Sequence, residues 1–338
     1  MQSSVFSDTK QNHTHLIDPF GRKMDYLRLA ITDRCNLRCQ YCMPAEGIPL
    51  KSHEHILQYE EMERLVHIFT SLGVNKIRIT GGEPFVRKGA LDFLKRINAL
   101  DGLKSINITT NAVLIEDILE DLSQLKIGSL NISIDSLKKD RFNKISRRDD
   151  FDKVWANIQR AVKSNLIVKL NMVVLAGIND DELLDFCRLA EQWPIEVRFI
   201  EQMPFSGGPA SQEVLNADQI VENITQTLPE LLEQDLQNST ARIFNHPAFQ
   251  GKIGVIAGYS RTFCDTCSRL RVTPDGQLKT CLYDYSSVDL RTLMRTGTSD
   301  DGIIAAIKTA IKNRAADGFE SQNRANQLYN LSMAQIGG

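Results

Sequence analysis

The sequence predicts an α/β protein: a partial, open (β/α)6 TIM-like barrel followed by a C-terminal α+β extension. Between residues 25 and 201, short β-branched runs alternate with longer segments whose apolar residues recur every three or four positions. This alternation is typical of βα units around a parallel sheet. Six units are fewer than the eight that close a barrel, so the sheet should stay open and curved.

Six candidate strands are rich in β-branched residues, which favour extended structure. They cover residues 26–32, 76–80, 105–110, 129–135, 167–174 and 195–201. Helical segments lie between them: in residues 59–73, Met62, Leu65, Val66 and Phe69 recur at helical spacing, and Gly73 suits a C-terminal cap. Because parallel strands end at one edge, the loops that follow them should carry the functional side chains.

The character of the sequence changes after Pro204. Residues 205–212 read as a loop, residues 216–234 as helical, and residues 242–285 as short strands. We therefore divide the chain into a polar N-terminal segment (1–24), a barrel (25–205) and a C-terminal region (206–338).

The charge and the cysteine content narrow the class of protein. Lys and Arg total 40 against 42 Asp and Glu, so the net charge of -2 gives no general attraction to nucleic acid or to anionic membranes. The N-terminal stretch lacks the apolar core of a signal peptide, and no run is long enough to span a membrane. We expect a cytoplasmic protein. In that reducing compartment, clustered cysteines indicate metal binding or catalysis instead of disulfides.

The first cysteine cluster follows the first strand and has the spacing Cys35-x3-Cys39-x2-Cys42. Three thiolates can hold three irons of a [4Fe-4S] cube and leave the fourth iron open. A zinc site completed by a distant histidine is the alternative, because structural zinc takes four ligands. Tyr41 lies between the last two cysteines. The second strand ends in Gly81-Gly82-Glu83, where the glycines allow a close approach to the backbone.

The second cluster is Cys264-x2-Cys267-x13-Cys281. The sequence PDGQ between two β-like segments predicts a hairpin turn that returns Cys281 to the other two cysteines. A zinc knuckle with a fourth ligand is the alternative, although His246, the nearest histidine, lies upstream of the usual spacing. The seventh cysteine, Cys187, lies among leucines at helical spacing and reads as a core residue.

Cationic side chains are placed within the predicted strands and after the second cluster. Arg269 and Arg271 alternate along one strand and should face the same side, where they could hold phosphates. Burial of a strand cation is costly unless it meets an anion. For each cation the alternative is an ion pair with a strand carboxylate, but four on separate strands favour a polyanionic ligand. These four are Arg28, Arg78, Lys169 and Arg198.

The first cluster, Tyr41 and the Gly-Gly-Glu turn together resemble the radical S-adenosylmethionine superfamily. Longer segments resemble the GTP 3',8-cyclases of molybdenum-cofactor biosynthesis. They are DPFGRKMDYLRLAITDRCNLRCQYCMP, KIRITGGEPFVRK, ITTN, LNISIDSL, VKLNMVVLAGIND (apart from its Leu175), EVRFIEQMP, TFCDTCSRLR, DGQLKTCL and the terminal GG.

The resemblance implies two [4Fe-4S] clusters, the second in the C-terminal extension, and S-adenosylmethionine as the source of a 5'-deoxyadenosyl radical. The radical would take a hydrogen from C3' of GTP, whose carbon radical then closes onto C8. The product would be (8S)-3',8-cyclo-7,8-dihydroguanosine 5'-triphosphate. The cluster ligands would be Cys35, Cys39, Cys42, Cys264, Cys267 and Cys281.

The resemblance also implies roles for individual residues. S-adenosylmethionine would be bound by Tyr41, Gly81, Gly82, Glu83, Ser133 and Met203. GTP would be bound by Arg28, Arg78, Thr109, Lys169, Arg198, Arg269, Leu270 and Arg271. Arg28, Arg269, Arg271 and the tail of Gly337 and Gly338 would take part in catalysis. Ala112 stands where the family commonly has glycine, so a positive φ there would strain the turn.

Partners follow from the same resemblance: a flavodoxin- or ferredoxin-like electron donor, a functional link to cyclic pyranopterin monophosphate synthase, and a second copy of the chain in a homodimer. No nucleic-acid or membrane partner is expected. Two other functions stay open. One is a peptide-modifying radical enzyme with an auxiliary cluster domain, and the other is a non-catalytic zinc or iron–sulfur scaffold.

Overall fold

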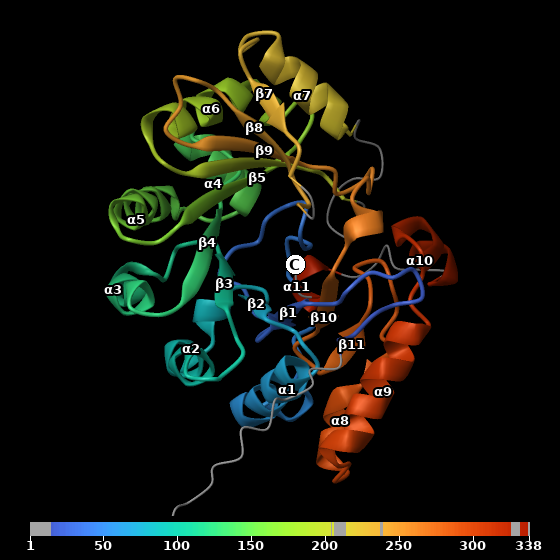
Figure 1. Cartoon of the computed structure of the whole chain (residues 1–338). Coiled ribbons are helices and arrows are strands. Elements are labelled where there is room, and N and C mark those ends of the chain that lie inside the picture. The colour runs from blue at the N-terminus through green and yellow to red at the C-terminus, as the bar shows by residue number, and fades with distance from the viewer. Residues whose placement is uncertain (1–14, 204, 206–213, 237–238, 326–331, 337–338) are drawn as a thin grey trace, which may run out of the picture.

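The computed structural model describes residues 15–203, 205, 214–236, 239–325 and 332–336. In this part of the chain, twelve strands form one sheet in the order β12-β11-β10-β1-β2-β3-β4-β5-β6-β9-β8-β7 (Figure 1). The strands are β1 (Tyr26–Ala30), β2 (Lys76–Thr80), β3 (Ser105–Thr110), β4 (Ile127–Ser133), β5 (Val168–Val174), β6 (Glu196–Glu201), β7 (Leu232–Gln234), β8 (Arg242–Asn245), β9 (Lys252–Ile256), β10 (Arg269–Val272), β11 (Gln277–Lys279) and β12 (Val288–Asp289).

All six predicted strands are present, and β2 and β3 match the prediction at both ends. The prediction for β4 was shifted by two residues because Gly128 gives the start of that strand a low β-propensity. At Gly128 a Cβ atom would lie 2.9 Å from the Cβ atom of Ser105 on β3, so the close approach of the two strands favours glycine there.

The parallel part of the sheet is wider than the six predicted units. β10 pairs in parallel with β1, and β9 pairs in parallel with β6. The α/β prediction with a mostly parallel, open sheet is confirmed. Residues after 206 thus extend both edges of the barrel sheet, while the boundary at 205/206 stays a prediction.

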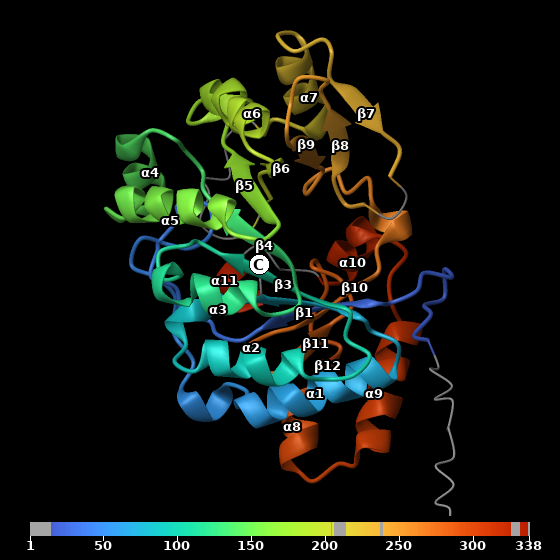
Figure 2. The ribbon, with the colours of Figure 1, turned by 60° about the vertical axis from the view of Figure 1, so that its left-hand side comes forward.

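Helices cover the outer side of the sheet, and Figures 1 and 2 show α2, α3 and α5 there while α11 lies near the centre. In α1, Met62, Leu65, Val66 and Phe69 are buried as predicted, and Gly73 has a φ of 89° just past its end. The helices are α1 (Tyr59–Ser71), α2 (Ala90–Asn98), α3 (Leu119–Ser123), α4 (Lys139–Ser146), α5 (Phe151–Lys163), α6 (Leu183–Gln192), α7 (Ala217–Thr225), α8 (Leu290–Arg295), α9 (Asp300–Lys312), α10 (Gly318–Arg324) and α11 (Met333–Ile336).

Alternation along the strands separates an apolar outer face from a polar inner face. On β1, Leu27 and Leu29 are fully buried in the core, whereas Arg28 lines a cavity on the other side. Cys187 is fully buried on α6, as predicted for a core residue. Among the described helices, none combines the length and the apolar character needed to cross a membrane.

Candidate functional site

Both cysteine clusters line one cavity on the inner side of the sheet. Its walls include the six cysteines Cys35, Cys39, Cys42, Cys264, Cys267 and Cys281. The first three belong to the loop after β1, and the others flank the β10–β11 hairpin. Sequence positions more than 200 residues apart therefore meet because β10 pairs directly with β1.

The first cluster loop is held by bonds to its own backbone. The Cys42 amide donates to the Cys39 carbonyl (2.9 Å), and Arg38 Nη1 donates to the Cys35 carbonyl (2.7 Å). Burial raises the pKa of Cys35 to about 12 and that of Cys42 to about 11. These thiols are therefore protonated at neutral pH until a metal supplies positive charge and displaces the protons.

The Gly-Gly-Glu turn packs directly on this loop. Gly82 N donates to the Thr32 carbonyl (2.7 Å), and Glu83 N donates to the Arg34 carbonyl (2.8 Å). A Cβ atom on Gly82 would lie 2.3 Å from the Arg34 oxygen, so no other residue fits without a shift of the backbone. We expected the glycines to admit a ligand; the group that closely approaches Gly82 here is the cluster loop itself.

The carboxylate of Glu83 fixes the end of the next strand. It is buried and accepts hydrogen bonds from Thr110 Oγ1 (2.8 Å) and Asn111 N (2.7 Å). Ala112 follows with a φ of 61°, so the alanine does adopt the strained left-handed conformation that we anticipated. Gly81, Gly82 and Glu83 line the cavity, and their contacts with a cofactor stay predictions.

The other predicted cofactor residues, Tyr41, Ser133 and Met203, also line the cavity. The Tyr41 hydroxyl donates to Asp135 Oδ2 (2.8 Å), and Val173 N donates to Asp135 Oδ1 (3.0 Å). This bond fixes the tyrosine ring beside the cluster loop. Burial raises the pKa of Asp135 to about 6.

The second cluster is built as predicted around a hairpin. Cys264 and Cys267 lie in the turn before β10, and Cys281 follows β11. Arg269 Nε and Arg314 Nη2 lie 3.4 Å and 3.3 Å from Cys267 Sγ and donate hydrogen bonds to it. Burial alone would raise the pKa of Cys267, but these two arginines lower it to about 6.

The three thiols of each cysteine cluster line the same cavity. Among the described residues, no three His, Cys, Asp or Glu side chains are placed to hold one metal ion. Burial raises the pKa of Cys39, and the charges of Asp135, Cys42 and Cys35 add to this rise. Burial also raises the pKa of Cys264, to which Cys281 and Cys267 contribute. The choice between a [4Fe-4S] cube and zinc, which the sequence left open, stays a prediction at both groups.

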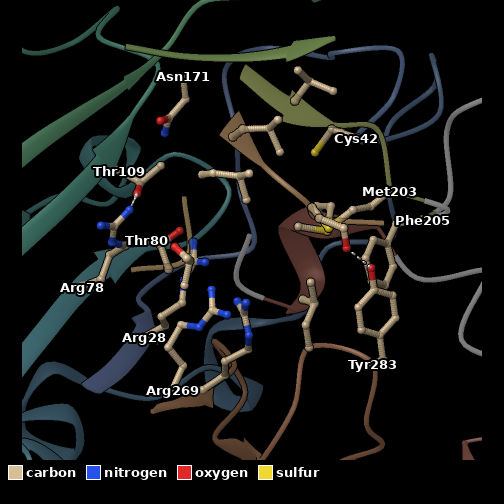
Figure 3. A pocket seen from close by; sticks show the side chains of 18 of the residues that line it. Arg28, Cys42, Arg78, Thr80, Thr109, Asn171, Met203, Phe205, Arg269 and Tyr283 are labelled. Carbon is tan, nitrogen blue, oxygen red and sulfur yellow. Dashed lines mark hydrogen bonds between the residues drawn. The ribbon is translucent and has the colours of Figure 1, made fainter. Parts of the chain in front are cut away.

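Three arginines form a row across neighbouring strands. Arg28 on β1 is in register with Arg271 on β10 and with Arg78 on β2. Burial and the neighbouring cations, Arg271 first, hold the pKa of Arg28 well below its usual value, and burial with Arg269 lowers that of Arg271 to about 10. Figure 3 shows Arg28, Arg78 and Arg269 on one side of the view and Cys42 on the other. Mutual repulsion of these charges would be relieved by a polyanion.

The remaining predicted substrate residues divide into two groups. Thr109 and Arg198 line the cavity, and Arg78 Nη1 donates to Thr109 Oγ1 (3.4 Å). Lys169 and Leu270 do not line it. Leu270 is fully buried in the core because it alternates with Arg269 and Arg271 on β10.

Two of the strand cations form the ion pairs that the sequence left open as an alternative. Glu196 accepts from Lys169 Nζ (2.6 Å) and from Arg198 Nε (2.5 Å). The carboxylate of Glu196 thus pairs with both cations, as the alternative interpretation of the strand cations expected.

Several cavity residues were missed by the sequence reasoning. Tyr26 and Asn171 could have been found, because they lie two positions from Arg28 and Lys169 on the same strand faces. Arg22 and Arg314 could not, because Arg22 bonds to the Cys264 carbonyl 242 residues away and Arg314 to Asp18 296 residues away. In α11, Met333 and Ala334 line the cavity, and Ser332 Oγ just before it donates to the Cys42 carbonyl (2.7 Å). Gly337 and Gly338 lie outside the described residues.

Two family models match the chain. The model of the Radical SAM superfamily matches residues 29–190, and the model described as Molybdenum Cofactor Synthesis C matches residues 195–319. The GTP 3',8-cyclase of Moorella thermoacetica is 41% identical over 324 residues, which cover 95% of this chain and 99% of that relative. The GTP 3',8-cyclase of Heliobacterium modesticaldum is 41% identical over 312 residues, covering 88% and 92%.

The animal relatives are longer. Molybdenum cofactor biosynthesis protein 1 of Mus musculus is 42% identical over 327 residues, which are 95% of this chain and 51% of the relative. The chain therefore spans about half the length of that protein. Among solved structures, Streptococcus suis SuiB aligns with a TM-score of 0.62 at 16% identity, over 94% of this chain and 78% of its own. At that identity the likeness concerns the fold alone.

Proposed function

The chain belongs to the GTP 3',8-cyclase family, and on that premise we propose that it converts GTP into (8S)-3',8-cyclo-7,8-dihydroguanosine 5'-triphosphate. The observation that carries the proposal is the shared cavity, which is lined by two groups of three cysteines and by Arg28, Arg78, Arg269 and Arg271. A substrate of this cavity has to be anionic at one end and able to reach both cysteine groups.

Two iron–sulfur clusters and S-adenosylmethionine fit this donor set. The first cluster would be held by Cys35, Cys39 and Cys42, and the second by Cys264, Cys267 and Cys281. When bound, the first cluster and S-adenosylmethionine supply the 5'-deoxyadenosyl radical that removes the C3' hydrogen of GTP. The cluster loop and the Gly82 turn contact each other through backbone bonds, which keeps the binding place for the cofactor rigid.

The arginine row orients the substrate. Arg28, Arg78 and Arg271 lie in register on adjacent strands, so their guanidinium groups present donors to successive oxygens of a triphosphate. Burial and the repulsion from neighbouring arginines lower the pKa of Arg28, and a bound anion would relieve that repulsion. The strands hold these groups in place before GTP arrives, so little ordering is needed on binding.

The C-terminal tail is the other element assigned to catalysis. The short helix α11 lies in the cavity wall, and Ser332 just before it bonds to the backbone of Cys42. These contacts support our proposal that Gly337 and Gly338 act beside the substrate. We also propose that Leu270 and Lys169 contact GTP. Leu270 would do so through its backbone, and Lys169 would do so after its ion pair with Glu196 opens.

The test is anaerobic incubation with S-adenosylmethionine, a reductant and GTP that carries deuterium at C3', followed by mass spectrometry. The proposal predicts transfer of deuterium to 5'-deoxyadenosine and a cyclised isomer of GTP. A variant with Cys264, Cys267 and Cys281 changed to alanine should cleave S-adenosylmethionine without making the isomer. Cleavage without cyclisation by the unmodified protein would contradict the proposal and leave only the superfamily chemistry.

The partners complete the proposal. A flavodoxin- or ferredoxin-like protein supplies the electron, cyclic pyranopterin monophosphate synthase uses the product, two copies of the chain form a dimer, and the reaction takes place in the cytoplasm. Size-exclusion chromatography with light scattering tests the dimer, and a coupled assay with the synthase tests the link between the two enzymes.

A further inference from the structure

The segment DPFGRK near the N-terminus contains Asp18 and Arg22, which pair with each other, and Asp18 also contacts Arg314; the three residues have no role in the proposed function. Asp18 and Arg22 form a buried ion pair between Asp18 Oδ2 and Arg22 Nε (2.6 Å). Arg314, which follows α9, lies 3.4 Å from the same carboxylate oxygen through Nη1. The exposed fractions of these side chains are 0% for Asp18, 6% for Arg22 and 3% for Arg314, so all three charges are removed from water.

The two arginines of this trio bind the loop that carries the second cysteine cluster. Arg22 Nη1 donates to the carbonyl of Cys264 (2.9 Å), and Arg314 Nη1 donates to the carbonyl of Cys267 (2.9 Å). Arg22 Nη2 also donates to the carbonyl of Ala315 (2.8 Å). The backbone carbonyls of both cysteines in the Cys-x-x-Cys turn thus accept hydrogen bonds from guanidinium groups.

Arg314 also reaches a metal-binding atom. Its Nη2 lies 3.3 Å from Cys267 Sγ and donates to it, next to the bond from Arg269. Hydrogen bonds to the sulfurs and nearby charge set the reduction potential of an iron–sulfur cluster. A reduced cluster carries one more negative charge, so a cation at this position stabilises the reduced form and raises the potential.

We propose that Asp18, Arg22 and Arg314 form a buried clamp that positions the Cys-x-x-Cys turn and sets the reduction potential of the second cluster. Arg314 raises the potential through its charge and its bond to Cys267 Sγ. Asp18 lies against the same guanidinium, partly neutralises it and so lowers the potential. The clamp residues act through Cys264 and Cys267 and are positioning residues. The inference rests on the second cluster of the proposed function.

The test is a redox titration followed by electron paramagnetic resonance, in a chain whose Cys35, Cys39 and Cys42 are changed to alanine so that one cluster remains. Arg314→Met should shift the midpoint potential to more negative values. Arg314→Lys keeps the charge and should shift it less.

Replacement of Asp18, the negative charge of the clamp, should shift the midpoint potential in the opposite direction. Asp18→Asn keeps an acceptor for Arg22 but removes the negative charge, so the potential should shift to more positive values. A clamp with only a structural role would lower the iron content without producing shifts of opposite sign.

The matched control is Arg295→Met. Arg295 also pairs with a carboxylate, that of Glu61, and donates to a backbone carbonyl, that of Ile56, but it does not line the cavity. Its loss should leave the potential unchanged. Equal potentials in the Arg314→Met, Asp18→Asn and parent proteins would overturn the clamp. A parent chain that binds no iron would instead contradict the second cluster, so the two failures are distinguishable.

Discussion

Glu201 offers the sharpest test of how the cavity is assembled. It is the last residue of β6, is fully buried, and lines the cavity. Its Oε2 accepts from Tyr259 N and Ser260 N (2.7 Å each), and its Oε1 accepts from Ser260 Oγ (2.7 Å) and Ala217 N (2.5 Å). One carboxylate thus joins β6 to the start of α7 and to the segment that leads to Cys264.

The change Glu201→Gln removes the charge, and in either orientation its amide NH2 faces at least one backbone donor: Ala217 N on one side, or Tyr259 N and Ser260 N on the other. Bonds to a charged group contribute about 1.5–3 kcal/mol each, so the loss of at least one with an unsatisfied donor left behind should cost about 2–4 kcal/mol of unfolding free energy. The segment before Cys264 would also lose its anchor, so the second cluster should be assembled incompletely.

A matched control is Glu182→Gln. Glu182 is also fully buried and accepts from Ser136 Oγ and Leu137 N (2.7 Å each), but it does not line the cavity. Anaerobic urea unfolding of the metal-free proteins gives the free energies, and iron per chain after reconstitution gives the cluster content. Both variants should be destabilised, and only Glu201→Gln should lose iron. A Glu201→Gln protein whose unfolding free energy is within about 1 kcal/mol of that of the unmodified chain, or which has full iron content, would show that Glu201 does not anchor the segment before Cys264.

Four further predictions concern the site. Gly82→Ala should lose the first cluster, because its Cβ atom would lie 2.3 Å from the Arg34 carbonyl oxygen; iron analysis that shows full content would contradict this. Arg78→Met should weaken GTP binding about 10- to 100-fold, the value of one charge-assisted contact, in anaerobic calorimetry, and unchanged affinity would remove Arg78 from the substrate site. Burial works to raise the pKa of Glu196, but its two cationic neighbours lower it on balance. The Glu196 carboxylate therefore stabilises the folded chain above its unfolded pKa of about 4.3, and this stabilisation is lost as the pH falls through its lower pKa in the folded chain. In urea unfolding between about pH 3 and pH 6, the free energy of unfolding of Glu196→Gln should fall less with decreasing pH than that of the unmodified protein. Deletion of residues 337–338 should abolish cyclisation with both clusters intact, and wild-type turnover by the truncated chain would refute the role of the tail.

Most strands of the parallel sheet and the six clustered cysteines could be predicted from the sequence, because both depend on local patterns. Strand alternation also placed Arg269 and Arg271 on the same face, and both line the cavity. It was the same alternation that turned Leu270 into the core, so a run of three residues from a family motif does not place three side chains in one site.

Features that depend on contacts between distant segments could not be read from the sequence. The pairing of β10 with β1 and of β9 with β6 brings the C-terminal region to both edges of the barrel sheet. The pairing of Lys169 with Glu196 depends on the register between β5 and β6, which no local pattern gives. The same holds for Arg314, whose partner Asp18 is 296 residues away.

We propose that each group of three cysteines holds a four-iron cluster and that both clusters face one cavity. Iron and sulfide content of the anaerobically reconstituted chain tests it most directly. The unmodified protein should bind about eight irons, and replacement of either group of cysteines by alanine should leave about four. Stoichiometric zinc, or about four irons in the unmodified protein with none lost when Cys264, Cys267 and Cys281 are replaced, would exclude two four-iron clusters.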